Sequence, residues 1–437
     1  MLLLLLVASG LSAQQDALVG TQVGVSERGA KEELAIFALK FAPWPVPVEA
    51  VAEIDREVAQ AFVNLGRFEV IGMAYRLDQE SVASFIETIR GFKEQNVEIP
   101  EQVQMGEEFF TQADLNRIVA SFVVVVPSVT FFNLFGERKP NQDPRYEVQL
   151  ETSFSFINVY SMRTLAEFSL QTEGSGVNRV VAARKAIDEI PEQLTYRIRS
   201  IPEFQLRSAV LQVQGQSVLM SLGRDMGVAV GDEYALLSPR TFESGTYTLQ
   251  KGLLLVRSVG EDTSTATVVW ADGEVQVGEE LKEIPRLGLD TTAYAHIVIG
   301  SGYPVLIGAR QSITRGVYRF RPFAGAEVAA HLWSMGGLPV NLYAGGEVDL
   351  YFQRFQFIPM LALGVGGTVP VRSDEQFRLT HVGGMLSATV SYLFAESLRV
   401  TTDFGYLQWF DVREAASRLR DRSYGGMVLG AGLSLRY

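Results

Sequence analysis

The last 150 residues alternate between apolar and small or polar side chains over long runs, and this alternation restricts the fold more than any other feature. A period of two is the repeat of a β-strand, in which successive side chains point to opposite faces. Runs of 12 to 15 residues exceed the usual strand of about five or six and suffice for a tilted strand to cross a bilayer. They lie at about 318–332, 340–352, 355–369, 379–393, 398–410 and 424–437.

Residues 288–437 also differ from the rest of the chain in composition. They hold 20 of the 40 glycines and no lysine, and their 13 arginines against 11 acidic residues give a charge of +2. Because the whole chain carries -12, residues 1–287 carry -14. Two differently solvated parts are therefore expected to meet near Pro285.

The connections between the alternating runs differ in length. Phe352–Phe355 and Phe394–Ser397 are tight turns, whereas Pro370–Arg378 and Asp411–Ser423 are longer and rich in charge. Short turns at one end and long polar loops at the other are typical of an outer-membrane barrel. Six strands are clear and Asp290–Ser312 has room for two more, so the sequence predicts an eight-stranded antiparallel transmembrane β-barrel over 288–437.

The final run ends in an aromatic residue, and its apolar face consists of Leu429, Ala431, Leu433, Leu435 and Tyr437. In this strand the chain resembles small bacterial outer-membrane β-barrel proteins. The resemblance implies outer-membrane lipid as the surroundings and recognition of these five residues by the barrel-assembly machinery.

Aromatic residues near the strand ends favour the membrane barrel over its alternative, a water-soluble antiparallel sandwich. The alternation itself does not distinguish the two folds, because either has one apolar and one polar face. The aromatic residues are Tyr318, Phe320, Trp333, Phe352, Phe355, Phe394, Trp409, Phe410 and Tyr437.

Charged residues on the other face of these strands would point into the barrel. An eight-stranded barrel has an interior just wide enough for side chains to fill. Charges in such a lumen must be paired to be tolerated, so we expect a plug of ion pairs rather than an aqueous pore. The set is Arg319, Arg321, Glu327, Glu347, Asp349, Arg399 and Asp403.

The chain begins with an apolar run, Met1–Ala13, that closes in small residues and fits a secretory signal peptide. Residues 14–33 form a short N-terminal segment. The absence of cysteine excludes disulfides, cysteine-ligated metal sites and a lipid-modified cysteine. The uncharged stretch Ile118–Gly136 has Pro127 at its centre and many β-branched residues, which favours a buried strand over a membrane helix.

Strand and helix patterns mix between 34 and 200, which predicts a periplasmic α/β domain. Strands are expected at 34–41, 67–71, 119–133, 145–159 and 163–172, and helices at 48–65, 79–93, 112–118 and 177–198, the last bent at Pro191. The helix followed by Arg67–Ile71 and a strand meander resembles the TolB N-terminal and CsgG class of envelope proteins. No residue-level function is transferred from that class.

Turn glycines at 215, 223, 227 and 231 separate short strands within 204–285, which predicts a small SH3-like β domain. The pattern Gly231-Asp232-Glu233-Tyr234 resembles the C-terminal domain of the flagellar assembly protein T family, a periplasmic ring component. The chain departs from that family at Gly278-Glu279, where a second Gly-Asp is expected, and in ending with a membrane barrel.

Residues suited to catalysis or metal binding are sparse. The three histidines, His296, His331 and His381, lack close metal-ligand spacing and are expected to be interior or interfacial structural residues. The glycines at 364, 366 and 367 precede no helix, so they are not a phosphate loop. His331, Ser334 and Glu347 could be assembled into a hydrolase triad, but no nucleophile motif surrounds the serine.

The sequence therefore predicts a multi-domain, non-enzymatic outer-membrane protein that needs no cofactor or metal. Its barrel would anchor periplasmic domains that serve as a scaffold or docking module for an envelope assembly with an unidentified protein partner. The resemblance to the flagellar assembly protein T family implies a flagellar assembly. The acidic balance argues against nucleic acid. A small transport pore with gating domains and, less favoured, a lipid hydrolase at the rim are the alternatives.

Heat treatment before electrophoresis tests the membrane barrel. We expect the full chain from isolated membranes to shift in mobility on heating, and residues 14–287 to resist protease in intact cells, because the barrel stays folded in detergent and the other domains face the periplasm. An unshifted band from a soluble fraction would mean that 288–437 is a soluble β domain.

Overall fold

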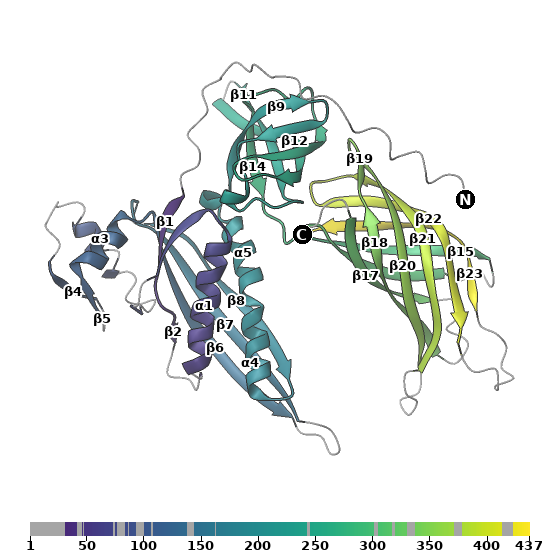
Figure 1. Cartoon of the computed structure of the whole chain (residues 1–437), viewed down its shortest axis with the longest axis horizontal. Coiled ribbons are helices and arrows are strands. Elements are labelled where there is room, and N and C mark those ends of the chain that lie inside the picture. Colours follow the sequence, from purple (N-terminus) through teal and green to yellow (C-terminus); the bar gives the residue numbers. More distant parts are fainter. Residues whose placement is uncertain are drawn as a thin grey trace. The chain divides into compact units, whose positions relative to one another are not determined.

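The computed structural model describes the chain from Lys31 onward with internal gaps, and the predicted signal peptide at 1–13 and most of segment 14–33 lie outside the described residues. The described residues are 31–41, 46, 48–72, 75–76, 84–85, 87–92, 100–105, 108–137, 144–161, 163–242, 245–300, 305–316, 320–329, 337–370, 378–412 and 423–437. Three β structures organise them: a mixed sheet, a small closed barrel and a large closed barrel (Figure 1).

The mixed sheet has the strand order β3-β1-β6-β7-β8, and β2 also pairs with β6. β1 runs parallel to β3 and β6, whereas β6, β7 and β8 form an antiparallel meander. The uncharged stretch around Pro127 is β6, as its β-branched residues indicated. The strands are β1 (Glu32–Ile36), β2 (Lys40–Phe41), β3 (Phe68–Gly72), β6 (Val123–Glu137), β7 (Arg145–Asn158) and β8 (Arg163–Gly176).

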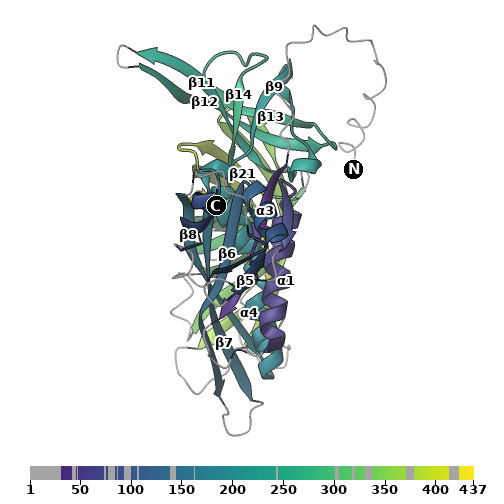
Figure 2. The ribbon, with the colours of Figure 1, turned by 90° about the vertical axis from the view of Figure 1, so that its left-hand side faces the viewer.

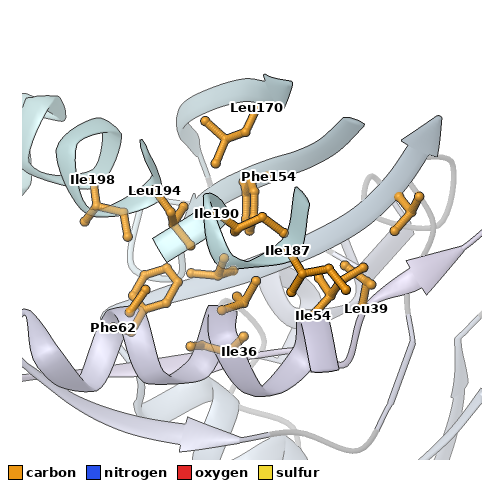
Figure 3. Close-up of a cluster of buried hydrophobic side chains, with 14 of the residues drawn as sticks. Ile36, Leu39, Ile54, Phe62, Phe154, Leu170, Ile187, Ile190, Leu194 and Ile198 are labelled. Atoms are coloured by element: carbon orange, nitrogen blue, oxygen red, sulfur yellow. The ribbon is translucent and has the colours of Figure 1, made fainter. Parts of the chain in front are cut away.

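Helices α1 (Val48–Asn64), α4 (Arg179–Asp188) and α5 (Ile190–Ser200) cover one face of this sheet (Figures 1 and 2). The apolar residues of α1 recur at helical spacing, so one stripe of the helix is buried. Figure 3 shows the resulting core, in which Phe62 of α1, Phe154 of β7 and Leu194 of α5 are fully buried.

The helix expected over Val177–Ile198 is two helices. Asn178 caps α4 by accepting a hydrogen bond from the Val181 N–H at 2.8 Å, and α4 ends at Asp188. Pro191 lies in the first turn of α5, a position where its missing N–H costs nothing. The proline therefore starts a new helix rather than bending one.

Part of the opposite face of the sheet is covered by α3 (Gln112–Ala120), which follows the hairpin of β4 (Gln102–Met105) and β5 (Glu108–Thr111). A second core there includes Phe37, Phe110 and Val124. Within the described parts of the chain, no helix combines the length and the apolar composition needed to span a membrane.

The small barrel closes in the order β10-β13-β12-β11-β14-β9 around a core that includes Tyr234, Leu254 and Val256. β11 pairs with β14 only as far as Leu237, and β12 pairs with β13 only from Gly252. Beyond these residues β11 and β12 pair with each other as a two-stranded ribbon (Figure 2). The strands are β9 (Arg207–Gln214), β10 (Ser217–Met220), β11 (Glu233–Phe242), β12 (Gly245–Val259), β13 (Ser264–Ala271) and β14 (Glu280–Ile284).

The large barrel is antiparallel throughout and closes where β15 pairs with β23. β19 continues β18 after Asp349, and both pair with β20, so the two together form one strand of the barrel wall. The described strands therefore form a wall of eight. The predicted eight-stranded antiparallel barrel is confirmed. The strands are β15 (Leu289–Gly300), β16 (Val305–Ile313), β17 (Phe320–Ala329), β18 (Gly337–Val348), β19 (Leu350–Phe352), β20 (Phe355–Pro370), β21 (Arg378–Leu393), β22 (Leu398–Asp411) and β23 (Tyr424–Arg436).

The outer face of the large barrel is apolar. Leu363, Leu386 and Met427 are 70%, 65% and 60% exposed, whereas the residues that alternate with them face inward. Of the aromatic residues expected near the strand ends, Phe320, Phe352, Phe355, Phe394, Phe410 and Tyr437 are exposed, and Tyr318 and Trp333 lie outside the described residues.

Trp409 was expected at the outer rim but is buried inside the large barrel. Its ring occupies space that two glycines leave open, because a Cβ atom at Gly364 or Gly383 would lie 2.9 or 2.8 Å from it. Such contacts are too short for any other residue, so these glycines admit an interior tryptophan.

The mixed-sheet core offers a matched pair of substitutions. We expect Phe154→Ala, at a fully buried position, to lower the free energy of unfolding by about 3–5 kcal/mol. Phe135→Ala, on the neighbouring strand and 48% exposed, should change it by less than about 0.5 kcal/mol. Pulse proteolysis of the full chain in urea measures both; equal effects would contradict the observed packing.

Candidate functional site

The lumen of the large barrel contains a cluster of ion pairs centred on Arg321. Its guanidinium lies 2.6 Å from Glu347, 2.8 Å from Asp349 and 3.0 Å from Asp290. All four side chains are buried. The alternation placed Arg321, Glu347 and Asp349 on the inward face. The fold brings them together from β17, from β18 and from the single residue between β18 and β19.

A second group of inward residues surrounds Asp403. Its carboxylate lies 3.2 Å from the His296 ring and 3.7 Å from Arg310, and it accepts a hydrogen bond from Thr389. His296 and Arg310 lie on β15 and β16, the two strands that the sequence located only as a region. The inward position of Arg310 was therefore not predicted, whereas His296 was expected to be an interior or interfacial structural residue.

Glu327 and Arg399 face the lumen, but neither forms an ion pair with another described residue. Glu327 accepts hydrogen bonds from Asn341 at 3.0 Å and Tyr294 at 3.2 Å. The Arg399 guanidinium lies 5.6 Å from the centroid of the Tyr351 ring. Hydrogen bonds and an aromatic ring thus replace the ion pairs expected for these two residues, and Arg319 lies outside the described residues.

The space left among these side chains is very small. A cavity lined by Asp290, Arg310, Arg321 and Glu347 has a volume of about 10 Å³. This is about the space of one water molecule. Aromatic and aliphatic side chains, among them Tyr294, Tyr343, Met360 and Trp409, fill the lumen further along the strands.

The small barrel contributes a charge to one end of this lumen. We call it the short-turn end, because β15 begins there, β23 ends there and the tight turns at 353–354 and 394–397 lie there. Glu233 of β11 forms an ion pair with Arg436 of β23. The Arg436 guanidinium also lies 2.7 Å from the Asp290 carboxylate. Arg286 lies 3.0 Å from Glu233 and donates to the Ser397 hydroxyl at 3.0 Å.

Apolar and cation–aromatic contacts surround this ion pair. Leu253, Leu255 and Val269 of the small barrel form one buried cluster with Tyr351 and Leu393 of the large barrel. The Arg257 guanidinium lies 4.9 Å from the centroid of the same Tyr351 ring. Glu233 and Arg436 are themselves only 1% and 6% exposed, so their ion pair is shielded from water.

A further buried network joins the small barrel to the mixed sheet. Glu283 of β14 lies 2.8 Å from Arg67 and 2.6 Å from Arg199 of α5, and Arg199 lies 2.9 Å from Asp232. Each of these four residues is less than 5% exposed. Asp232 also pairs with Arg315 at 2.7 Å, on the turn after β16.

The pKa values in this network follow from burial and charge. Burial opposes ionisation of Glu283, but the charges of Arg67 and Arg199 and their hydrogen bonds more than offset it and lower its pKa to about 2. Burial beside Glu283 and Asp232 raises the pKa of Tyr234 well above its usual value. The carboxylate of Glu283 is thus ionised at all ordinary pH values.

The predicted barrel-assembly residues occupy the outer face of β23. Leu429, Leu433, Leu435 and Tyr437 are exposed, as the alternation indicated, and Ala431 shares their face. His296 and His381 are buried inside the large barrel. No three histidine or acidic side chains gather as a metal site in the part of the chain that the structure describes, and His331 and Ser334 lie outside it.

The residues that join the three β structures were not predicted as functional. Asp232 and Glu233 belong to the pattern Gly231-Asp232-Glu233-Tyr234, which resembles the flagellar assembly protein T family. This resemblance was the only sequence signal for the two residues. Arg67, Arg199, Glu283 and Arg286 lie far apart along the chain, so neither spacing nor composition marks them as partners.

No protein-family model matches the sequence, and no curated protein matches it. Among solved structures, the chain is similar to the PelC dodecamer from Paraburkholderia phytofirmans, with 13% identity over 41% of this chain and 93% of that chain and a TM-score of 0.21.

Two further solved structures are similar to about a third of the chain. Neisserial surface protein A shows 14% identity over 34% of this chain and 96% of that chain, with a TM-score of 0.23. A major outer membrane protein from Thermus thermophilus shows 10% identity over 34% of this chain and 99% of that chain, with a TM-score of 0.21. The structural neighbours thus include outer-membrane β-barrel proteins, the class that the C-terminal sequence resembles.

Removing the Glu283 charge tests the junction network. We expect Glu283→Gln to lower the free energy of unfolding by about 3–5 kcal/mol at pH 7, because two buried guanidinium groups lose their carboxylate. Urea unfolding of the full chain in detergent measures this. Glu280→Gln, in an exposed pair with Arg207, is the matched control and should have little effect.

The pH dependence follows from the lowered pKa. The ionised Glu283 carboxylate contributes its full stabilisation of the fold above its ordinary pKa of 4.5. This stabilisation is lost as the pH falls towards its lowered pKa of about 2. Glu283→Gln should therefore remove part of the acid sensitivity between these values. An unchanged acid profile would mean that Glu283 is not held as an ion.

Proposed function

We propose that this chain is a non-enzymatic outer-membrane protein whose large barrel anchors a scaffold or docking module. The observation that carries the proposal is the filled lumen beside the buried Glu233–Arg436 pair. A lumen that its described side chains fill is suited to anchoring rather than to transport. The exposed apolar outer face supports a lipid environment.

The scaffold would consist of an α/β domain at 34–200 and an SH3-like domain at 204–285, both in the periplasm after removal of residues 1–13. A six-stranded closed barrel supports the SH3-like assignment, and a sheet with helices on one face supports the α/β assignment. The contacts of Glu233 and Arg286 at the short-turn end support the periplasmic side, because short turns face the periplasm in outer-membrane barrels.

Two exposed surfaces could receive a protein partner. Phe131 and Phe135 of β6 are 41% and 48% exposed on the sheet face opposite α1. The ribbon of β11 and β12 presents Leu249, which is 42% exposed. Beyond Leu237 and Gly252 the outer edges of the ribbon pair with no further described strand. Exposed aromatic residues and open strand edges are features that protein interfaces use. The partner would belong to an envelope assembly, with a flagellar one suggested only by the resemblance.

Bilayer recordings distinguish an anchor from the alternative pore. We expect the full chain in a planar bilayer to give no steady conductance, because ion pairs and aromatic side chains fill its lumen. Protein-free detergent is the control. Reproducible unitary steps would favour the pore.

Photo-cross-linking in intact cells tests the docking role. A photoreactive residue at Phe135 or Leu249 should give a discrete protein adduct, whereas one at Leu363, on the apolar outer face, should contact lipid and give none. Adducts at neither Phe135 nor Leu249 would contradict the scaffold role at these surfaces.

A further inference from the structure

A groove of about 740 Å³ lies where the small barrel meets the short-turn end of the large barrel. The small barrel lines it with Trp270 of β13 and with Asp272 and Glu274 of the turn that follows. The large barrel lines it with Arg354, Phe355 and Tyr392. Its size suits a small organic ligand.

The groove adjoins the outer surface of the large barrel. Phe355 and Tyr392 are 52% and 39% exposed on that surface, and their ring centroids lie 5.0 Å apart. Tyrosine and other amphipathic aromatic residues concentrate at the level of lipid headgroups in membrane proteins. The groove therefore opens at the headgroup level of one leaflet, given the proposed membrane position.

Arg354 offers a cation at this level. Its guanidinium lies over the Trp270 ring, 4.2 Å from the centroid. The Arg354 carbonyl accepts from the Leu393 N–H, and within the described residues no acceptor is found for its guanidinium N–H groups. A planar guanidinium that stacks on a ring keeps its donors in a fixed plane, which matches the oxygens of a phosphate.

The small-barrel side of the groove is acidic. Asp272 and Glu274 lie in the exposed turn around Gly273, where positive φ allows the reversal of the chain. A ligand that carries only negative charge would be attracted by Arg354 and repelled by both carboxylates. A ligand with a phosphate and an ammonium group would satisfy both sides.

We propose that this groove binds the headgroup of a zwitterionic amino-phospholipid from the adjoining leaflet, such as phosphatidylethanolamine. Arg354 binds the phosphate, Asp272 and Glu274 bind the ammonium group, and the acyl chains follow Phe355 and Tyr392 along the barrel. The proposal rests on the membrane position of the barrel and adds a lipid specificity to it.

Native mass spectrometry of the full chain in mild detergent tests the proposal with dioleoyl-phosphatidylethanolamine, dioleoyl-phosphatidylglycerol and inorganic phosphate as probes. We expect the wild-type protein to retain the ethanolamine lipid about tenfold better than the glycerol lipid. Arg354→Gln should weaken ethanolamine-lipid retention about fivefold or more, and Arg354→Lys should recover part of it, because the charge returns without the planar fork.

The double variant Asp272→Asn with Glu274→Asn should lose the preference between the two lipids while still binding both. Arg224→Gln, an exposed arginine of the small barrel outside the groove, is the matched control and should bind as wild type. Each variant is checked for the heat shift of the folded barrel, so that a loss of binding reflects the groove.

Equal retention of both lipids by the wild-type protein, or unchanged retention by Arg354→Gln, would overturn the lipid proposal while the anchor remains. Displacement of the lipid by millimolar inorganic phosphate would mean that the groove is an anion site, which also overturns it. Absence of the heat shift in the wild-type protein would instead contradict the membrane anchor itself.

Discussion

The buried ion pair between Glu233 and Arg436 is the interaction on which the rest of the structure depends. A carboxylate and a guanidinium removed from water are tolerated only when each is paired and hydrogen-bonded. Arg436 also forms an ion pair with Asp290, and Arg286 donates a hydrogen bond to the other carboxylate oxygen of Glu233. Separating the two barrels would expose or orphan several charges at once, so this contact keeps them together.

The pairing of buried charges bears on the role of the large barrel and is repeated elsewhere in the structure. The described side chains fill the lumen of the large barrel up to the charged junction with the small barrel, which suits an anchor rather than a conduit. The same principle recurs at Arg199, whose guanidinium joins Glu283 to Asp232. Arginine suits such sites because its fork of donors serves two carboxylates in one plane.

The sequence predicted the large barrel well because its signal is local. A period of two assigns each residue of β17 to β23 to a face, and burial at Arg321 and exposure at Leu363 agree with it. Two predictions were wrong. Trp409 was assigned to the rim because it lies near a strand end, although the alternation places it on the inward face of β22 with Arg399 and Asp403, where Gly364 and Gly383 leave room for its ring. Pro191 starts α5 instead of bending a helix.

The sequence by itself determined the strand period, the number of strands and the inward direction of charged residues such as Arg321 and Asp403, because the period of two relates residues that are close neighbours in the chain. Only the tertiary structure decided which charges pair. Arg67 and Glu283 are 216 positions apart and Glu233 and Arg436 are 203 apart, and their attraction acts only once folding brings them within a few ångströms. The groove beside Arg354 exists for the same reason: its two walls belong to different barrels, and no local pattern records their meeting.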